Sequence, residues 1–257
     1  MGIITFTSDF GTKDHYVAAV KAKIYSFNPN IKVEDISHSI QPHDIGHGAH
    51  VLGSVFRDFP VGTVHLVAIN THSHVKEKLI ALKLEEHFFV GEDNGFFSLL
   101  TEKKPTAICE LPYDPNSGDT FPEKTILARA AVSLASGSSV YDLGKQLLET
   151  KIFKHRAPLF SDKVIECHVK HIDTYGNLIT NLTKELFNAT MGIEKFAYLQ
   201  IRRERIEKIV KSYKDAFPGE AVAFFNSNNW LQININFGNA SELLGMAVGD
   251  PIYIYFR

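Results

Sequence analysis

The spacing of hydrophobic and polar residues divides the chain into two parts. In the first part, short apolar runs alternate with segments whose apolar residues recur every three to four positions, the spacing of one helix face. Strands are predicted over residues 3–7, 32–36 and 64–69, with helices over residues 16–27 and 44–59 between them. Strands separated by helices in this order predict a mostly parallel sheet with right-handed crossovers.

The second part consists of short strands separated by turn residues. The predicted strands cover residues 164–172, 178–182, 196–201, 221–225, 230–236 and 251–256. Alternation is regular from Leu231 to Asn236, so one face of that strand is expected to be buried and the other polar. We therefore predict an α/β domain over residues 1–158, with a mostly parallel sheet, and a small antiparallel, barrel-like β domain over residues 163–257.

Composition narrows the possible partners. The 257 residues are 44% hydrophobic, which is enough for a real core, and the net charge of −2 does not favour nucleic acid. The amino terminus lacks the features of a signal peptide, and no apolar run is long enough to span a membrane. Cys109 and Cys167 lack metal-like spacing, which favours free thiols in a reducing compartment. A cytoplasmic protein is therefore expected.

Three segments that join an acidic residue to a glycine contain the candidate chemistry. Asp9 follows the first predicted strand, and ligands bind at the carboxyl ends of strands in open α/β sheets. A carboxylate there can accept two hydrogen bonds from a ribose diol, and Gly11 allows close backbone approach. The other two segments are Asp93-Asn94-Gly95 and Asp173-Thr174-Tyr175-Gly176-Asn177. Taken singly, each is also a common turn sequence.

In this order and setting, the three segments resemble the S-adenosylmethionine hydroxide adenosyltransferase family, relatives of the fluorinating and chlorinating adenosyltransferases. The resemblance implies that Asp9 holds the ribose, that Asp173 and Ser227 hold methionine, and that Asn177 holds adenine. It implies S-adenosylmethionine or adenosine as the ligand, no cofactor, and a homotrimer whose ligand lies between domains of neighbouring subunits. The ligand-binding residues expected are Asp9, Phe10, Asp93, Asn94, Phe121, Asp173, Asn177 and Ser227.

The sequence departs from the family at the catalytic triad. Hydrolytic members carry Asp, Arg and His there, and the matching residues are Asn70, Glu77 and Pro122. The resemblance implies hydrolysis of S-adenosylmethionine to adenosine and methionine, and the lost triad implies that turnover is slow or absent. His72 and His74 are the nearby groups that could orient or deprotonate water at neutral pH.

Two other functions fit the sequence. A protein that has lost the triad could bind a nucleoside without turning anything over. Alternatively, His43, His47 and His50 would share one face of a helix, where they could hold Zn²⁺ or Fe²⁺ in a metal-dependent hydrolase.

Structural roles are open for the same candidates. His72 and His74 could be exposed loop residues, and Glu77 could form a solvated pair with Lys124. His38 is interpreted as a hydrogen-bonded packing residue.

Overall fold

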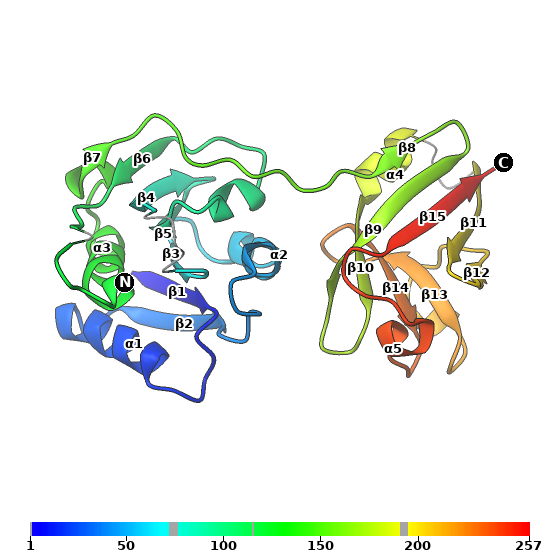
Figure 1. The fold of residues 1–257 in the computed structure, drawn as a ribbon, viewed down its shortest axis with the longest axis horizontal. Helices are drawn as coiled ribbons and strands as arrows, with labels where there is room; N and C mark the ends of the chain where they lie inside the picture. The colour runs from blue at the N-terminus through cyan, green and yellow to red at the C-terminus, as the bar shows by residue number, and fades with distance from the viewer. Residues whose placement is uncertain (1, 72–76, 115, 191–194) are drawn as a thin grey trace. The chain divides into compact units, whose positions relative to one another are not determined.

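The computed structural model describes residues 2–71, 77–114, 116–190 and 195–257, and the chain divides into two compact units, Met1–Lys154 and His155–Arg257 (Figure 1). This division falls slightly before the predicted boundary, which left residues 159–162 outside both domains. The segment belongs to the second unit because β8 (Leu159–Phe160) pairs with β9 (Val164–Ile172).

A seven-stranded sheet with the strand order β2-β1-β3-β5-β4-β6-β7 forms the centre of the first unit. Its parallel strands are β2 (Lys32–Ser37), β1 (Ile3–Ser8), β3 (Val64–Ala68) and β5 (His87–Glu92). The strands β4 (Leu79–Leu84), β6 (Ala107–Glu110) and β7 (Lys145–Gln146) extend it in antiparallel fashion. The predicted parallel sheet is confirmed for the amino-terminal strands.

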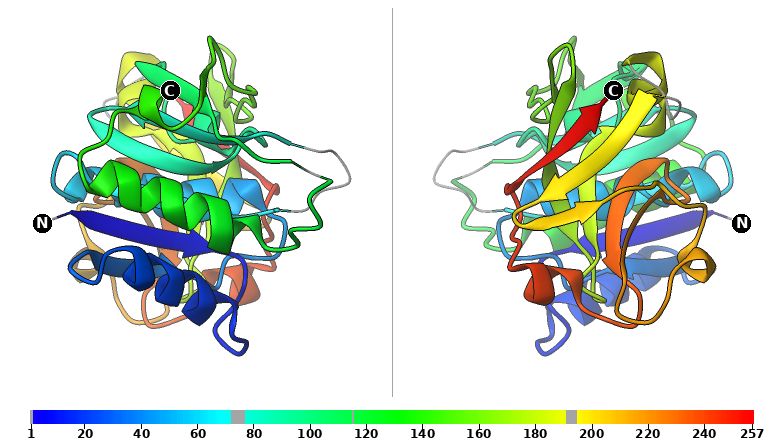
Figure 2. Two further views of the ribbon diagram at one scale, coloured as in Figure 1. Left: turned by 90° about the vertical axis from the view of Figure 1, so that its left-hand side faces the viewer. Right: turned by 90° about the vertical axis from the view of Figure 1, so that its right-hand side faces the viewer.

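Helices cover both faces of this sheet. On one face, α1 (Tyr16–Phe27) and α3 (Ala128–Ala135) lie side by side, and a π-helical turn, η3 (Glu123–Leu127), leads into α3 (Figure 2). On the other face lie α2 (Ile45–Gly53) and the 3₁₀ turns η1 (Phe56–Asp58) and η2 (Phe96–Leu99), and a further 3₁₀ turn, η4 (Val140–Asp142), follows α3. Because successive strand residues point to opposite faces, Leu66 joins the first core and Val67 the second.

The second predicted helix is shorter than expected. It was predicted over residues 44–59, but α2 ends at Gly53. The Ser54 hydroxyl donates to the carbonyl oxygen of His50 at 2.7 Å, and the chain then tightens into η1, which buries Phe56 completely. The hydrophobic periodicity continued past the helix end because the 3₁₀ turn faces the same core.

The second unit is an antiparallel sheet with the strand order β12-β11-β15-β9-β10-β14-β13. The remaining elements are β10 (Leu178–Thr183), α4 (Lys184–Thr190), β11 (Phe196–Ile201), β12 (Glu204–Ile206), the 3₁₀ turn η6 (Tyr213–Asp215), β13 (Ala221–Phe225), β14 (Trp230–Ile235), α5 (Ala240–Leu244) and β15 (Pro251–Phe256). Ile209, just after β12, forms a bridge with Ala223 in β13. The sheet is thereby nearly closed, which confirms the predicted barrel-like domain.

Both cysteines are buried free thiols, as expected. Burial raises the pKa of Cys167 to about 12, so this thiol is inert at neutral pH. Within the described ranges, none of the helices is long and apolar enough to cross a membrane.

Candidate functional site

The Asp9 side chain lies where β1 ends, and two backbone groups from distant loops hold it. Asp9 Oδ2 accepts hydrogen bonds from the N–H of His43 at 2.9 Å and from the N–H of Asn70 at 3.0 Å. Both donors have left-handed backbones, with φ of 66° for His43 and 53° for Asn70. Non-glycine residues adopt this conformation at a cost, and such strain concentrates at functional sites. The loops after β2 and β3 thus converge on the carboxylate expected to hold the ribose.

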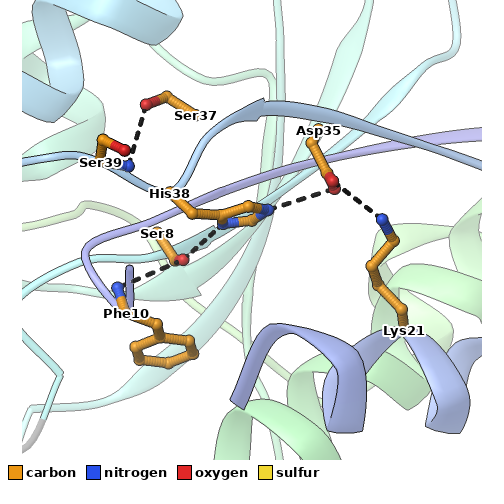
Figure 3. A network of polar contacts seen from close by, with 7 residues as sticks. All are labelled: Ser8, Phe10, Lys21, Asp35, Ser37, His38 and Ser39. Carbon is orange, nitrogen blue, oxygen red and sulfur yellow. Dashed lines mark hydrogen bonds and ion pairs between the residues drawn. The ribbon is translucent and has the colours of Figure 1, made fainter. Parts of the chain in front are cut away.

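The turn that carries Asp9 is tied to the segment after β2. Gly11 is left-handed at φ 72° and donates its N–H to the carbonyl oxygen of His38 at 2.8 Å. The hydroxyl of Ser8 lies 2.7 Å from His38 Nδ1 (Figure 3). His38 is therefore hydrogen-bonded and buried, which confirms the interpretation of this residue from the sequence.

An aromatic cluster adjoins the same turn. The rings of Phe10, Tyr16 and Phe121 form a triangle, with centroid separations of 5.8 Å, 5.7 Å and 5.9 Å. Phe121 precedes η3, so the fold brings together two expected ligand-binding residues, Phe10 and Phe121, that are far apart in the chain. These tilted and edge-to-face contacts build an apolar wall next to a carboxylate.

The segment from Asp93 to Gly95 has a clear structural role at the end of β5. The buried side chain of Asn94 donates to the carbonyl oxygen of Ile69 at 2.9 Å, which ties this turn to the loop after β3. Gly95 is left-handed, and a Cβ atom there would lie only 2.6 Å from the ring of Phe153. Burial raises the pKa of Asp93, whose carboxylate accepts the N–H of Lys151 at 2.8 Å. Asn94 thus shapes the site beside Asn70 through its amide.

The residues at the family's triad positions make other contacts in the structure. The N–H of Asn70 is committed to Asp9, and Glu77 forms an ion pair with Lys151 Nζ at 2.6 Å, not the predicted pair with Lys124. Pro122 is buried and immediately precedes the π-helical turn, whose first residue, Glu123, is only 1% exposed. The candidates His72 and His74 lie outside the described residues.

The three histidines proposed as metal ligands do not share a helix face. His43 precedes the helix, and Asp44 is the N-cap that accepts the N–H of His47 at 2.8 Å. Only His47 and His50 lie in α2. Across the described parts of the chain, no group of three or more His, Cys, Asp or Glu residues could hold a metal ion. The geometry therefore contradicts the metal-hydrolase interpretation, because His43 has a left-handed backbone and lies outside the helix.

In the second unit, Asp173 organises the turn between β9 and β10. Asp173 Oδ1 accepts the N–H groups of Tyr175 at 3.0 Å and Asn177 at 2.9 Å, and Oδ2 accepts from the Asn177 side chain at 2.8 Å. Gly176 is left-handed, and a Cβ atom there would lie 1.8 Å from Asn239 Oδ1. The glycine is thus required both by its backbone conformation and by the close approach of Asn239.

A pocket of about 510 Å³ lies beside this turn, and Asn177, Tyr213, Asn236 and Phe237 are among its lining residues. The Tyr213 hydroxyl donates to Asn234 Oδ1 at 3.0 Å. Burial, followed by the negative charge of Asp173, raises the pKa of Tyr213, so the phenol stays protonated. The pocket therefore offers an amide, a phenol and aromatic surface, which suits a flat heterocycle.

Ser227, an expected ligand-binding residue, and Phe237 are both exposed in this region. Ser227 is exposed in the turn between β13 and β14 and does not line the pocket. Phe237 has a left-handed backbone at φ 59° and is 92% exposed, both of which are unusual for a bulky apolar residue.

Sequence reasoning assigned no ligand role to Tyr213 and gave His38 only a packing role. Tyr213 has charged neighbours in the sequence, such as Lys211 and Lys214, which give no local sign of a ligand role. It reaches the pocket because η6 turns it toward β14, a tertiary contact without a local sequence signal. The contact between His38 and Ser8 could have been predicted from the sequence. His38 directly follows β2 and Ser8 ends β1, and neighbouring parallel strands end at the same edge of the sheet.

Comparison with known proteins agrees with this architecture. Residues 4–144 match the family model described as the SAM hydroxide adenosyltransferase N-terminal domain, and residues 167–253 match the corresponding C-terminal domain. The chain is 33% identical to an (R)-S-adenosyl-L-methionine hydrolase of Methanocaldococcus jannaschii, over 100% of this chain and 97% of that protein. It is 29% identical to a protein of the same name from Thermus thermophilus, over 97% of this chain and 98% of that protein.

A solved structure shares the fold over its whole length. It is the crystal structure of an uncharacterized conserved protein from Thermotoga maritima, with a TM-score of 0.88 at 30% identity, covering 98% of this chain and 99% of that one. An α/β unit with a carboxylate fixed at its strand ends, followed by a barrel-like β unit, defines the class of protein. The chain belongs to the SAM hydroxide adenosyltransferase family.

Proposed function

We propose that the protein binds S-adenosyl-L-methionine and hydrolyses it to adenosine and methionine. The observation that carries this proposal is the Asp9 carboxylate, held by two backbone N–H groups at the carboxyl end of β1 in a chain of this family. One carboxylate oxygen is fixed by the protein, which orients the side chain as a hydrogen-bond acceptor for the ribose hydroxyls. The relatives named above act on the same substrate.

The second unit supplies groups suited to adenine and to methionine. The pocket beside Asn177 and Tyr213 accepts the adenine ring, and the Asn177 amide can both donate and accept hydrogen bonds. Asp173 already accepts three hydrogen bonds within its own turn, and a carboxylate has about four acceptor sites. The site that remains can receive the methionine ammonium, and the Ser227 hydroxyl would join Asp173 as a second acceptor.

Hydrolysis in this protein depends mainly on how the substrate is positioned. Water attacks the ribose 5′ carbon as the bond from that carbon to the sulfonium breaks, methionine leaves as a neutral thioether, and the water gives up one proton. The leaving group is good, so the main tasks are to hold the ribose and methionine in line and to exclude bulk solvent. Asn70 and Pro122 supply no general base, and the Glu77 carboxylate is paired with Lys151 and would repel a hydroxide. Because general acid–base help is worth about 10²–10⁴-fold, we expect slow turnover.

The complete site includes residues from a neighbouring subunit of a homotrimer, as the family resemblance implies. Asp173, Asn177 and Ser227 of one subunit would serve the Asp9 site of another. Sedimentation equilibrium of the full chain should give the mass of a trimer, and adenosine affinity should fall when the assembly is diluted into subunits. A monomer with full affinity would contradict this part of the proposal.

Chromatography of the products from purified protein and S-adenosyl-L-methionine tests the activity. We expect adenosine and methionine in equal amounts, formed slowly, with Asp9→Asn as the matched variant that loses activity. The double variant His72→Ala/His74→Ala decides whether an imidazole assists, in which case the wild-type rate rises with pH near the ordinary histidine pKa of about 6.5.

Other outcomes of the same assay point to different functions. Tight adenosine binding without turnover would support a silent nucleoside-binding protein. A halide-dependent product would place the chain with the halogenating relatives. Rapid hydrolysis that neither Asp9→Asn nor the histidine pair affects would refute the assignment of the site.

A further inference from the structure

A chain of polar side chains leads from the surface to the turn that carries Asp9 (Figure 3). The hydroxyl of Ser8 lies 2.7 Å from His38 Nδ1, and Nε2 of the same ring lies 3.2 Å from Asp35 Oδ1, a close polar contact but not a well-aligned hydrogen bond. Lys21 Nζ completes the chain at 2.9 Å from Asp35 Oδ2. Ser8 is fully buried and His38 is 5% exposed, whereas Asp35 reaches solvent.

The charges at the outer end set the direction of the Ser8–His38 hydrogen bond. Burial lowers the pKa of His38 despite the opposing effect of Asp35, so the ring is neutral at neutral pH. Partial burial raises the pKa of Asp35, but the bonds from Lys21 and His38 lower it by more, and the carboxyl is ionised. A carboxylate only accepts, so the proton of the neutral ring belongs on Nε2 and Nδ1 accepts from Ser8. The Ser8 oxygen then accepts the N–H of Phe10 at 3.4 Å.

A serine, a histidine and an aspartate in a row are also the arrangement of a hydrolytic triad. Here the serine cannot act as a nucleophile, because its side chain is fully buried and no substrate can reach it. This row of polar side chains must therefore act through the backbone of the Asp9 turn, which it supports.

His38 holds the Asp9 turn at both ends. Its ring bonds Ser8 on one side of Asp9, and its carbonyl oxygen accepts the N–H of Gly11 on the other. The ring also packs edge-on against Phe6, with centroids 4.8 Å apart. Because one oxygen of Asp9 is already bound by two backbone N–H groups, the orientation of this turn decides where the other oxygen points.

We infer that Ser8 and His38 are positioning residues, which orient the Asp9 carboxylate toward the two ribose hydroxyls. This inference rests on the proposed function, in which Asp9 binds the ribose. The inference predicts a selective loss of affinity. Loss of the Ser8–His38 bond should weaken the part of the affinity that depends on the ribose hydroxyls and leave the rest unchanged.

Calorimetric titration of the full-length protein with adenosine and with 2′,3′-dideoxyadenosine measures that part directly. The ratio of the two dissociation constants reports the contribution of the hydroxyls. We expect the wild type to favour adenosine, and Ser8→Ala and His38→Phe to reduce this preference about tenfold, the equivalent of one to two hydrogen bonds. In His38→Asn, the amide oxygen can accept from Ser8 in place of Nδ1, so this variant should recover part of the preference.

The same strand provides a matched control. Thr5 Oγ1 lies 2.7 Å from His65 Nδ1, a buried hydroxyl–imidazole contact of the same length, located away from the Asp9 turn. Thr5→Val should therefore lower thermal stability as Ser8→Ala does, without changing the preference for adenosine. This comparison separates a positioning role from general destabilisation.

Each outcome decides a different question. Equal weakening of both ligands in Ser8→Ala, or an unchanged preference in both Ser8→Ala and His38→Phe, would overturn the inference and leave the proposed function intact. A wild type that binds both ligands equally would overturn the inference together with the ribose role of Asp9. A wild type that binds neither ligand would overturn the proposed function itself.

Discussion

Two carboxylates with similar sequence surroundings are held in opposite ways. Asp9 in the first unit is bound by N–H groups that lie 34 and 61 residues away in the chain. Asp173 in the second unit is bound by N–H groups two and four residues away, within its own turn. Asp9 therefore depends on how the loops after β2 and β3 pack, whereas Asp173 depends mainly on local sequence.

The same contrast extends to the buried histidines of the first unit. Thr5, His65 and His87 form a hydrogen-bonded row across β1, β3 and β5, with contacts of 2.7 Å and 3.2 Å that join residues far apart in sequence. Long-range contacts of this kind form only when the sheet is complete. Side chains in the first unit are thus positioned precisely, but only when the whole sheet has folded. This difference between the units can be tested.

Acid should affect the first unit most strongly. Burial, and then the nearby His87, lowers the pKa of His65 from its usual 6.5 to about 3. Because this folded-state pKa lies below the unfolded value, the unfolded chain takes up the proton first. The stability is fully present above about pH 6.5 and is lost as the pH falls toward about 3, by an amount on the order of several kcal/mol.

Two optical signals distinguish the units during this titration. The single tryptophan, Trp230, lies in the second unit, whereas the three longest α-helices, α1, α2 and α3, lie in the first, and only the shorter α4 and α5 lie in the second. Helical circular dichroism should therefore decline at a higher pH than the Trp230 fluorescence changes, and His65→Phe should shift the first transition to lower pH. If the tryptophan signal changed first, the comparison would be wrong.

Asp9→Ala should weaken binding of adenosine or S-adenosyl-L-methionine by about 1.5–3 kcal/mol, the scale of hydrogen bonds to a charged group. Calorimetry measures the loss. Asp9→Asn is the informative companion, because its amide oxygen can still accept from His43 and Asn70 while the second oxygen is lost. Wild-type affinity in Asp9→Asn would show that the second oxygen does not meet the ligand.

Asp173→Asn should lower the free energy of unfolding of the second unit by about 1 kcal/mol, measured by denaturant titration of Trp230 fluorescence. The side-chain oxygen can still accept from the N–H groups of Tyr175 and Asn177, but the new amide faces the amide of Asn177 and one hydrogen bond is lost. The helical signal of the first unit should not change. An effect confined to ligand binding would indicate that Asp173 contributes little to the turn.

The smallest effect is expected at the ion pair that replaces the family's triad arginine. Lys151→Ala removes the partner of Glu77, and the lysine is 40% exposed, so we expect a loss of at most about 1 kcal/mol in stability. Lys151→Arg is the control that keeps the charge. A loss of several kcal/mol in denaturant titrations would mean that the pair has a larger structural role.

Much of this architecture could be predicted from the sequence. Apolar runs with period two or 3.6 identified β1, β3, β9 and most other strands, because the burial of one face leaves a direct pattern in the chain. The predicted end of α2 was wrong for a physical reason. A 3₁₀ turn that faces the same core continues the hydrophobic spacing past the helix end. The Asp173 turn could also be predicted from the sequence, because its hydrogen bonds join residues two to four positions apart.

What the sequence determined by itself is the order of the elements, the family to which the chain belongs and the presence of Asp9 at a strand end. Only the tertiary structure decided that His43 and Asn70 converge on that carboxylate, that Ser8 meets His38 and that Tyr213 borders the pocket beside Asn177. The reason is that local propensity and periodicity act over a few residues. These contacts join segments tens of residues apart, and their geometry exists only after the strands have paired and the loops have packed.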